Sequence, residues 1–103
     1  MIQRVEAGRE LSQSALLQLS ESLPDLIGQG ITSFCVDTSS VIEFDSLTLE
    51  ALLEFDALAK SRGLKVLIDR PSAVFSQALR ITGLIEHLDV SEIAHEVEGP
   101  VAS

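Results

Sequence analysis

The feature that most constrains this chain is the alternation of short apolar runs with longer segments of helical periodicity. Residues 34–36 (Phe-Cys-Val) form a continuous apolar run that closes on Asp37, a pattern typical of a strand buried on both faces. Residues 64–68 predict a second strand, and shorter extended pieces are expected at residues 2–5 and 88–90. Because helical segments separate these strands, the pattern predicts an α/β fold with a small mixed, mostly parallel β-sheet and helices packed on it.

The first helical segment follows residue 12 and carries one apolar face. Its large apolar side chains recur at spacings of three and four, at Leu16, Leu19, Leu23 and Ile27. Ser12 or Ser14 is expected to cap this helix, because a serine hydroxyl can accept the first free amide hydrogen. Pro24 lacks the N–H that would bond to Ser20, so we expect a kink or a break near Ser22.

Two further helices are predicted between the later strands. Asp45 or Ser46 can cap the first of them, and Gly63 can end it. Ser72 can cap the second, and residues 91–97 are expected to add a short terminal helix. The residues expected to face inward on the helix capped by Ser72 are Val74, Phe75, Ala78 and Leu79.

Length and hydropathy indicate one domain that stays where it is made. At 103 residues the chain is near the usual size of a single domain, so we expect a domain over residues 1–98 and a tail over residues 99–103. No apolar run approaches the roughly 20 residues needed to cross a bilayer, and the N-terminus has no stretch resembling a secretory signal. We therefore expect a cytoplasmic protein without direct membrane insertion.

Charge and cysteine usage restrict the partners. Sixteen acidic residues against seven basic ones give a formal net charge of −9, which on average repels phosphate backbones and anionic lipids. Trp and Tyr, which provide stacking platforms for single strands, are absent, so no nucleic acid partner is expected. The single Cys35 cannot form an internal disulfide, and it is expected to be a buried, inert thiol without a cation beside it.

The sequence lacks the constellations of common catalytic and metal sites. His87 and His95 lie in the same stretch without a clustered Cys or Asp, so no metal site is expected. Neither the phosphate-binding glycine motifs nor the G-x-S-x-G motif occurs. The acidic pair Glu43 and Asp45 is interpreted as a solvated edge rather than an acid–base pair. We expect a protein that is not an enzyme and that binds no cofactor.

Residues 37–49 have the most unusual composition, because they join a strand to a helix through a segment rich in hydroxyls and acids. At a helix N-terminus the free amides and the helix dipole favour negative charge. A hydroxyl there is either a plain N-cap, contributing about 1 kcal/mol, or a phosphorylation site. The residues alone leave both interpretations open.

This segment resembles the signature of the STAS family, in which a strand ends in Asp-Leu-Ser-Gly-Val and a helix begins with Asp-Ser-Ser-Gly-Leu. Residues 57–63 are similar to the family's helix exit, and residues 79–84 resemble its Leu-x-x-Thr-Gly-Leu motif. Three motifs in order make the resemblance fairly specific over about residues 2–97. The positions that match the signature with identical spacing are Asp37, Ser39, Val41, Asp45, Ser46 and Leu49.

The resemblance implies a non-catalytic interaction domain like the anti-sigma factor antagonists, which bind an anti-sigma factor kinase in a phosphorylation-controlled partner switch. Ser46 and Thr48 are the candidate phospho-acceptors. Leu47 and Thr48 depart from the family's Ser-Gly, and some STAS proteins without that motif instead brace the ATPase of ABC lipid transporters. The partner-binding residues implied by the match are Asp37, Ser39, Ser40, Asp45, Ser46, Leu47, Thr48 and Glu50.

Two expectations concern exposed surfaces. Leu47 is either a core residue or the apolar centre of the docking surface, because its helix is apolar over much of its circumference. The resemblance places the start of the chain at the family's second strand, so we expect the family's first strand to be missing. The edge from Ile2 to Val5 is therefore a candidate for pairing with a second copy.

Overall fold

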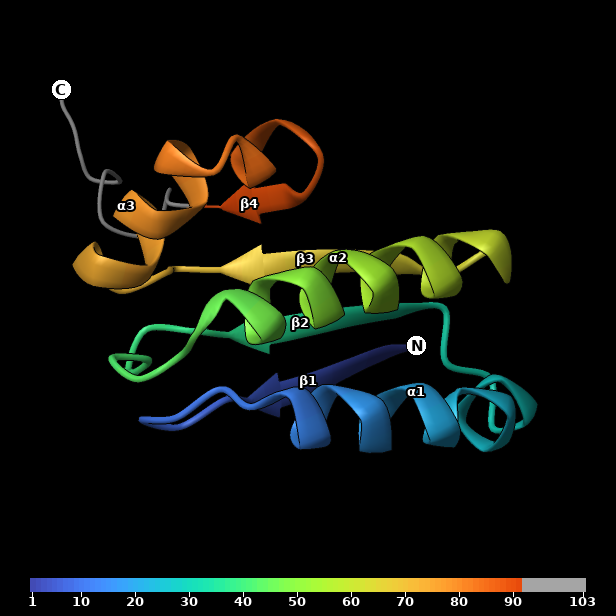
Figure 1. Ribbon diagram of the computed structural model, residues 1–103. Coiled ribbons are helices and arrows are strands. Elements are labelled where there is room, and N and C mark those ends of the chain that lie inside the picture. The colour runs from blue at the N-terminus through green and yellow to red at the C-terminus, as the bar shows by residue number, and fades with distance from the viewer. Residues whose placement is uncertain (92–103) are drawn as a thin grey trace, which may run out of the picture.

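The computed structural model describes residues 1–91 and shows a four-stranded sheet with three α-helices (Figure 1). The strands lie in the order β1-β2-β3-β4, and each is parallel to its neighbour. The expected α/β fold is confirmed, and the sheet is parallel throughout residues 1–91. In chain order the elements are β1 (Ile2–Glu6), α1 (Gln13–Gly28), β2 (Ser33–Asp37), α2 (Ser46–Ser61), β3 (Lys65–Asp69), α3 (Ala73–Ile81), the 3₁₀ turn η1 (Leu84–Glu86) and β4 (Asp89–Ser91).

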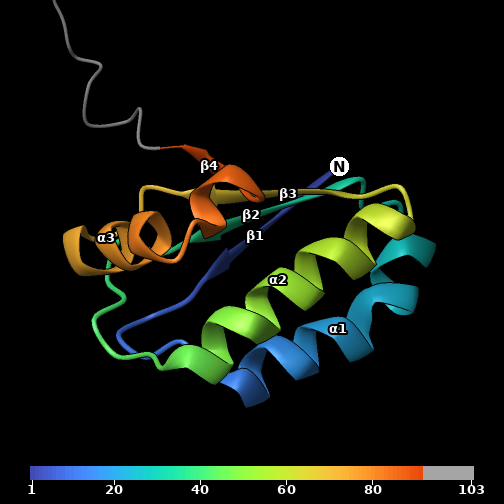
Figure 2. The ribbon, with the colours of Figure 1, turned by 45° about the horizontal axis from the view of Figure 1, so that its top comes forward.

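The strand order explains why the helices gather on one side of the sheet. Each connection moves to the next strand in the same direction, and right-handed crossovers then place the connecting helices on the same face. Figure 2 shows α1 and α2 side by side beneath the sheet, with α3 near the carboxyl ends of the strands. The opposite face carries no helix within the described part of the chain.

The core lies between the sheet and this helical layer. The inward-pointing residues of the two central strands are each at most 1% exposed, namely Phe34, Val36, Val66 and Ile68. The Phe34 ring meets the edge of Phe55 from α2, with 5.6 Å between the ring centroids. Leu16 and Leu23 are buried and Leu19 and Ile27 are partly buried, so the predicted apolar face of α1 is confirmed.

The three helices begin where the sequence predicted. Their N-caps are Ser12, Asp45 and Ser72, and each cap side chain accepts the backbone N–H three residues further on. The chain leaves α2 at Gly63, whose φ of +82° lies in the left-handed region that favours glycine. The ends of these elements are therefore set by local side-chain chemistry.

Two local predictions are wrong. The expected break is absent, because α1 continues through Pro24, with Leu23 buried before the proline and Leu26 and Ile27 partly buried after it. Val74, which was expected to face inward, is 46% exposed. The short helix α3 turns only one side to the core, and Phe75 and Leu79 occupy that side.

Several predictions fall outside the described residues. They concern His95, the domain boundary at residue 98 and the tail at residues 99–103. The predicted terminal helix at residues 91–97 starts at Ser91, which belongs to β4, and its remainder is also outside. Within residues 1–91, no helix is long and apolar enough to cross a membrane.

Candidate docking surface at the carboxyl end of the sheet

The loop between β2 and α2 is anchored through Thr38. Its backbone N–H and its hydroxyl both donate to the Asp69 carbonyl oxygen, at 3.0 and 3.2 Å. The Ser72 N–H donates in turn to the Thr38 carbonyl oxygen at 3.1 Å. Thr38 is fully buried, whereas Ser39 and Ser40 are exposed. The anchoring therefore presents the two serines that the sequence assigned to the partner-binding surface.

The first turn of α2 is closed by a capping box. Asp45 Oδ1 accepts both the backbone N–H and the hydroxyl of Thr48, each at 2.9 Å. The bond from the Thr48 N–H is the main reason that the pKa of Asp45 lies below its usual value. Thr48 is only 2% exposed. The cap engages its hydroxyl, so Thr48 is less accessible than Ser46, the other predicted phospho-acceptor.

Three exposed residues, Ser46, Leu47 and Glu50, form what we call the helix tip. Leu47 is 53% exposed, which settles the open question between a core and a surface position. The buried centre of a protein interface is more apolar than its rim. Beside the tip runs a groove of about 220 Å³ lined by Ser46, Leu49, Glu50, Leu53, Thr82 and Leu84.

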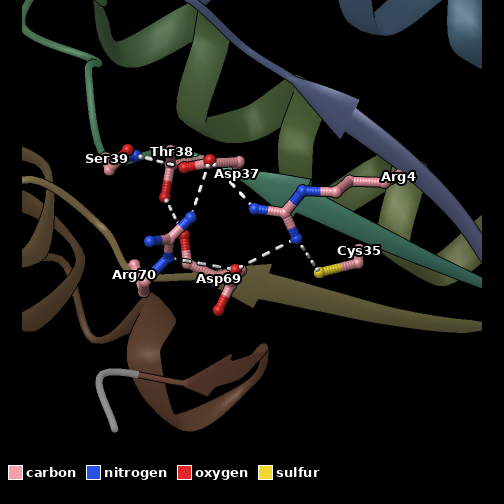
Figure 3. Close-up of polar contacts among 7 residues, drawn as sticks. All are labelled: Arg4, Cys35, Asp37, Thr38, Ser39, Asp69 and Arg70. Atoms are coloured by element: carbon pink, nitrogen blue, oxygen red, sulfur yellow. Dashed lines mark hydrogen bonds and ion pairs between the residues drawn. The ribbon is translucent and has the colours of Figure 1, made fainter. Parts of the chain in front are cut away.

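The acids that end β2 and β3 form an ion-pair network on the helix-free face of the sheet (Figure 3). Asp37 Oδ2 lies 3.0 Å from a guanidinium nitrogen of Arg4 and 3.0 Å from one of Arg70. Asp69 pairs with the same two arginines at 3.4 and 3.3 Å. Asp37 was expected to contact the partner, but its charge is already matched within the chain.

Asp37 also orders the loop that follows it. Its Oδ1 accepts the Ser39 backbone N–H at 3.0 Å. Hydrogen bonds from Ser39 are the largest cause of the lowered pKa of Asp37, with smaller contributions from the charges of Arg70 and Arg4. Asp37 therefore orders the loop between β2 and α2, and the exposed members of the predicted partner-binding set are Ser39, Ser40, Asp45 and the helix tip.

Cys35 differs from the prediction in two ways. It alternates with the core residues of β2, so its side chain points to the helix-free face and is half-buried. Arg4 Nη1 lies 3.4 Å from its Sγ, so a cation is adjacent. Desolvation, followed by the charge of Asp69, nevertheless raises the pKa of the thiol. A raised pKa disfavours the thiolate, which is the reactive form of cysteine.

The sequence analysis did not identify Arg4 and Arg70 as members of the ion-pair network. It also did not identify Leu84 as a wall of the groove beside the helix tip. A usable signal was present, because Asp37 and Asp69 each end a predicted strand and the carboxyl ends of parallel strands meet at one edge. Arg4 and Arg70 could be assigned to that edge only once the strand order was known. Within residues 1–91, no group of three or more His, Cys, Asp or Glu residues could hold a metal ion.

Comparison with known proteins agrees with this architecture. No curated protein sequence matches the chain. Among solved structures it resembles the crystal structure of a sulfate transporter family protein from Wolinella succinogenes, with a TM-score of 0.71, 22% identity, and 98% of this chain and 75% of that chain covered. Likeness at this identity shows the fold. The family model described as "Mlab, STAS domain" matches residues 3–92, and the chain therefore belongs to this STAS domain family.

Proposed function

We propose that this STAS domain is a non-catalytic docking module that binds one protein partner through the helix tip. The observation that carries the proposal is the exposure of Leu47 in the first turn of α2. Leu47 and the adjoining groove offer an apolar centre, and Ser39, Ser40 and Glu50 offer a polar rim. That division between an apolar core and a polar rim is typical of protein interfaces.

The partner class favoured by this surface is the ATPase of an ABC-type lipid transporter, which the domain would brace as a fixed subunit. An uncharged leucine at the centre of the tip suits a constitutive interface, since it carries no group that a kinase could modify. The solved neighbour, a sulfate transporter family protein, is consistent with a role beside a transporter. Such a role implies a cytoplasmic location for the domain.

A phosphorylation-controlled partner switch with an anti-sigma factor kinase is the second candidate. It is favoured by Ser46, which is exposed as the first residue of α2. A phosphate there would add a charge of about −1.5 to −2 beside Asp45 and Glu43. Repulsion and desolvation would then release a partner docked on the helix tip. With Thr48 buried, Ser46 is the acceptor that this candidate retains.

A capture experiment in lysate of the source organism separates these proposals. The baits are the wild type, Leu47→Asp, and the matched control Leu17→Asp, which alters a similarly exposed leucine on α1. We expect wild type and Leu17→Asp to capture a transporter ATPase, identified by mass spectrometry, and Leu47→Asp to lose about tenfold or more of it. Capture of a kinase together with phosphorylation of Ser46 would favour the switch. Equal capture by all three baits would refute docking through the helix tip.

A further inference from the structure

β1 is the edge strand of the sheet, and within residues 1–91 nothing pairs with its outer side. The Met1 carbonyl and the Ala7 N–H both bond to the neighbouring chain segment that contains β2. Backbone groups point alternately to the two sides of a strand, so the intervening even-numbered residues direct theirs outward. The residues whose backbone donors and acceptors line the open edge are thus Ile2, Arg4 and Glu6. Such a row is a template for another strand.

An apolar groove of about 300 Å³ follows the same edge on the helical side of the sheet. Its lining includes Val5 of β1, Leu11 from the segment between β1 and α1, and Leu16 and Leu19 of α1. Val5 and Leu19 are only partly buried against the core. A strand added beside β1 would cover this apolar surface. It would also form hydrogen bonds with the backbone groups on the open edge of β1.

We propose that the added strand is β1 of a second copy, running antiparallel to the first about a two-fold axis beside Val5. In this register Arg4, whose guanidinium also pairs with Asp37 and Asp69, lies opposite the partner's Glu6, and symmetry repeats the pair. Opposite charges directly across an antiparallel ladder stabilise it, whereas like charges destabilise it. A two-fold axis at Arg4 would place two arginines face to face, so the charge sequence of β1 selects the register centred on Val5.

The same register also suits the apolar groove. Odd-numbered residues of β1 make no outward backbone bonds, so Val5 and the partner's Val5 would form a non-hydrogen-bonded pair with closely spaced side chains. Val5 lines the groove, so the valine pair would join the two grooves across the axis. The sheets of both copies would become one continuous sheet, an isologous interface without a free β1 edge.

Sedimentation velocity tests the pairing. We expect the wild type to shift from one copy to two with rising concentration, and Arg4→Glu and Glu6→Arg each to abolish the shift. Mixing these two variants restores opposite charges at every cross-strand position, so the mixture should dimerise. A wild type that stays a single copy, or a mixture that behaves like its components, would overturn the proposal.

Disulfide trapping tests the register without altering Arg4, which also supports the ion-pair network. In a Cys35→Ser background, Val5→Cys should form a disulfide between copies on mild oxidation, because facing positions lie within bonding reach. Gln3→Cys is the matched control on the same side of β1, and it should remain unlinked because it faces the partner's Ala7. Equal linking of both variants, or linking of neither, would contradict the register. The helix tip lies elsewhere, so this outcome is independent of the docking proposal.

Discussion

The two faces of the sheet bury the same strands in different ways. On the helical face, Phe34 and Val36 are each 1% exposed and belong to the main core. On the other face, Cys35 and Leu67 are half-buried beside a shallow depression of about 540 Å³. Parallel sheets are ordinarily covered on both faces. Here a single direction of winding leaves one face without a helix in the described part of the chain.

This difference separates two sources of stability. Apolar burial stabilises the helical face, and its contribution does not depend on the charge of any side chain. The open face instead carries the network of Asp37 and Asp69 with Arg4 and Arg70. We therefore expect substitutions on the helical face to lower the free energy of unfolding strongly at every pH. Substitutions in the ion-pair network should lower it moderately, by an amount that depends on pH.

The largest difference in stability is expected between substitutions of Phe34 and Cys35, which are neighbours on β2 and point to opposite faces of the sheet. Phe34→Ala should lower the free energy of unfolding by about 3–5 kcal/mol, because it leaves a cavity against Phe55. Cys35→Ala should lower it by less than about 1 kcal/mol, since the thiol is half-buried on the open face. Urea titrations of both variants measure the difference. Similar losses would remove the distinction between the faces.

A moderate, pH-dependent effect is expected at Asp37. Asp37→Asn should cost about 1–3 kcal/mol at neutral pH, because it removes charge-assisted bonds to two arginines. The folded pKa of Asp37 is lowered, so its contribution is complete above the unfolded pKa of about 3.9 and is lost as pH falls through the folded pKa. Urea titrations at neutral pH and below about pH 4 should show the gap between wild type and variant closing. A gap independent of pH would contradict the network's role.

The smallest effect on stability is expected at the helix tip. Leu47→Asp should change the free energy of unfolding by less than about 1 kcal/mol, as should the control Leu17→Asp, because both leucines are more than half exposed. Thermal and urea unfolding of the two variants provide the comparison. A large loss confined to Leu47→Asp would mean that this residue supports the fold, and its effect on docking would then be indirect.

The sequence was informative where structure is decided locally. Ser12, Asp45 and Ser72 were identifiable as caps, because a short polar side chain before an apolar periodic segment has one simple use. Gly63 was identifiable as the end of α2 for a similar reason. The parallel sheet also followed, since alternating strands and helices have few ways to bury their apolar faces.

Features that depend on distant contacts were harder to predict. Pro24 indicated a kink or a break, but the helix is continuous, with Leu23 buried before the proline and Leu26 and Ile27 partly buried after it. A threonine near a helix N-terminus is a plausible phospho-acceptor by residue type. Only the geometry of the cap shows that the Thr48 hydroxyl is bonded to Asp45. The cation beside Cys35 comes from Arg4, which reaches it only after β1 and β2 have paired.

The central claim, docking through the helix tip, is tested most directly by photo-crosslinking in cells of the source organism. A benzophenone amino acid is placed at Leu47 in one variant and at Leu17 in a second, so that exposure and helical context are matched. We predict a single major adduct, with one partner protein, from position 47 and none from position 17. Adducts of equal yield from both positions, or no adduct from position 47, would contradict the claim.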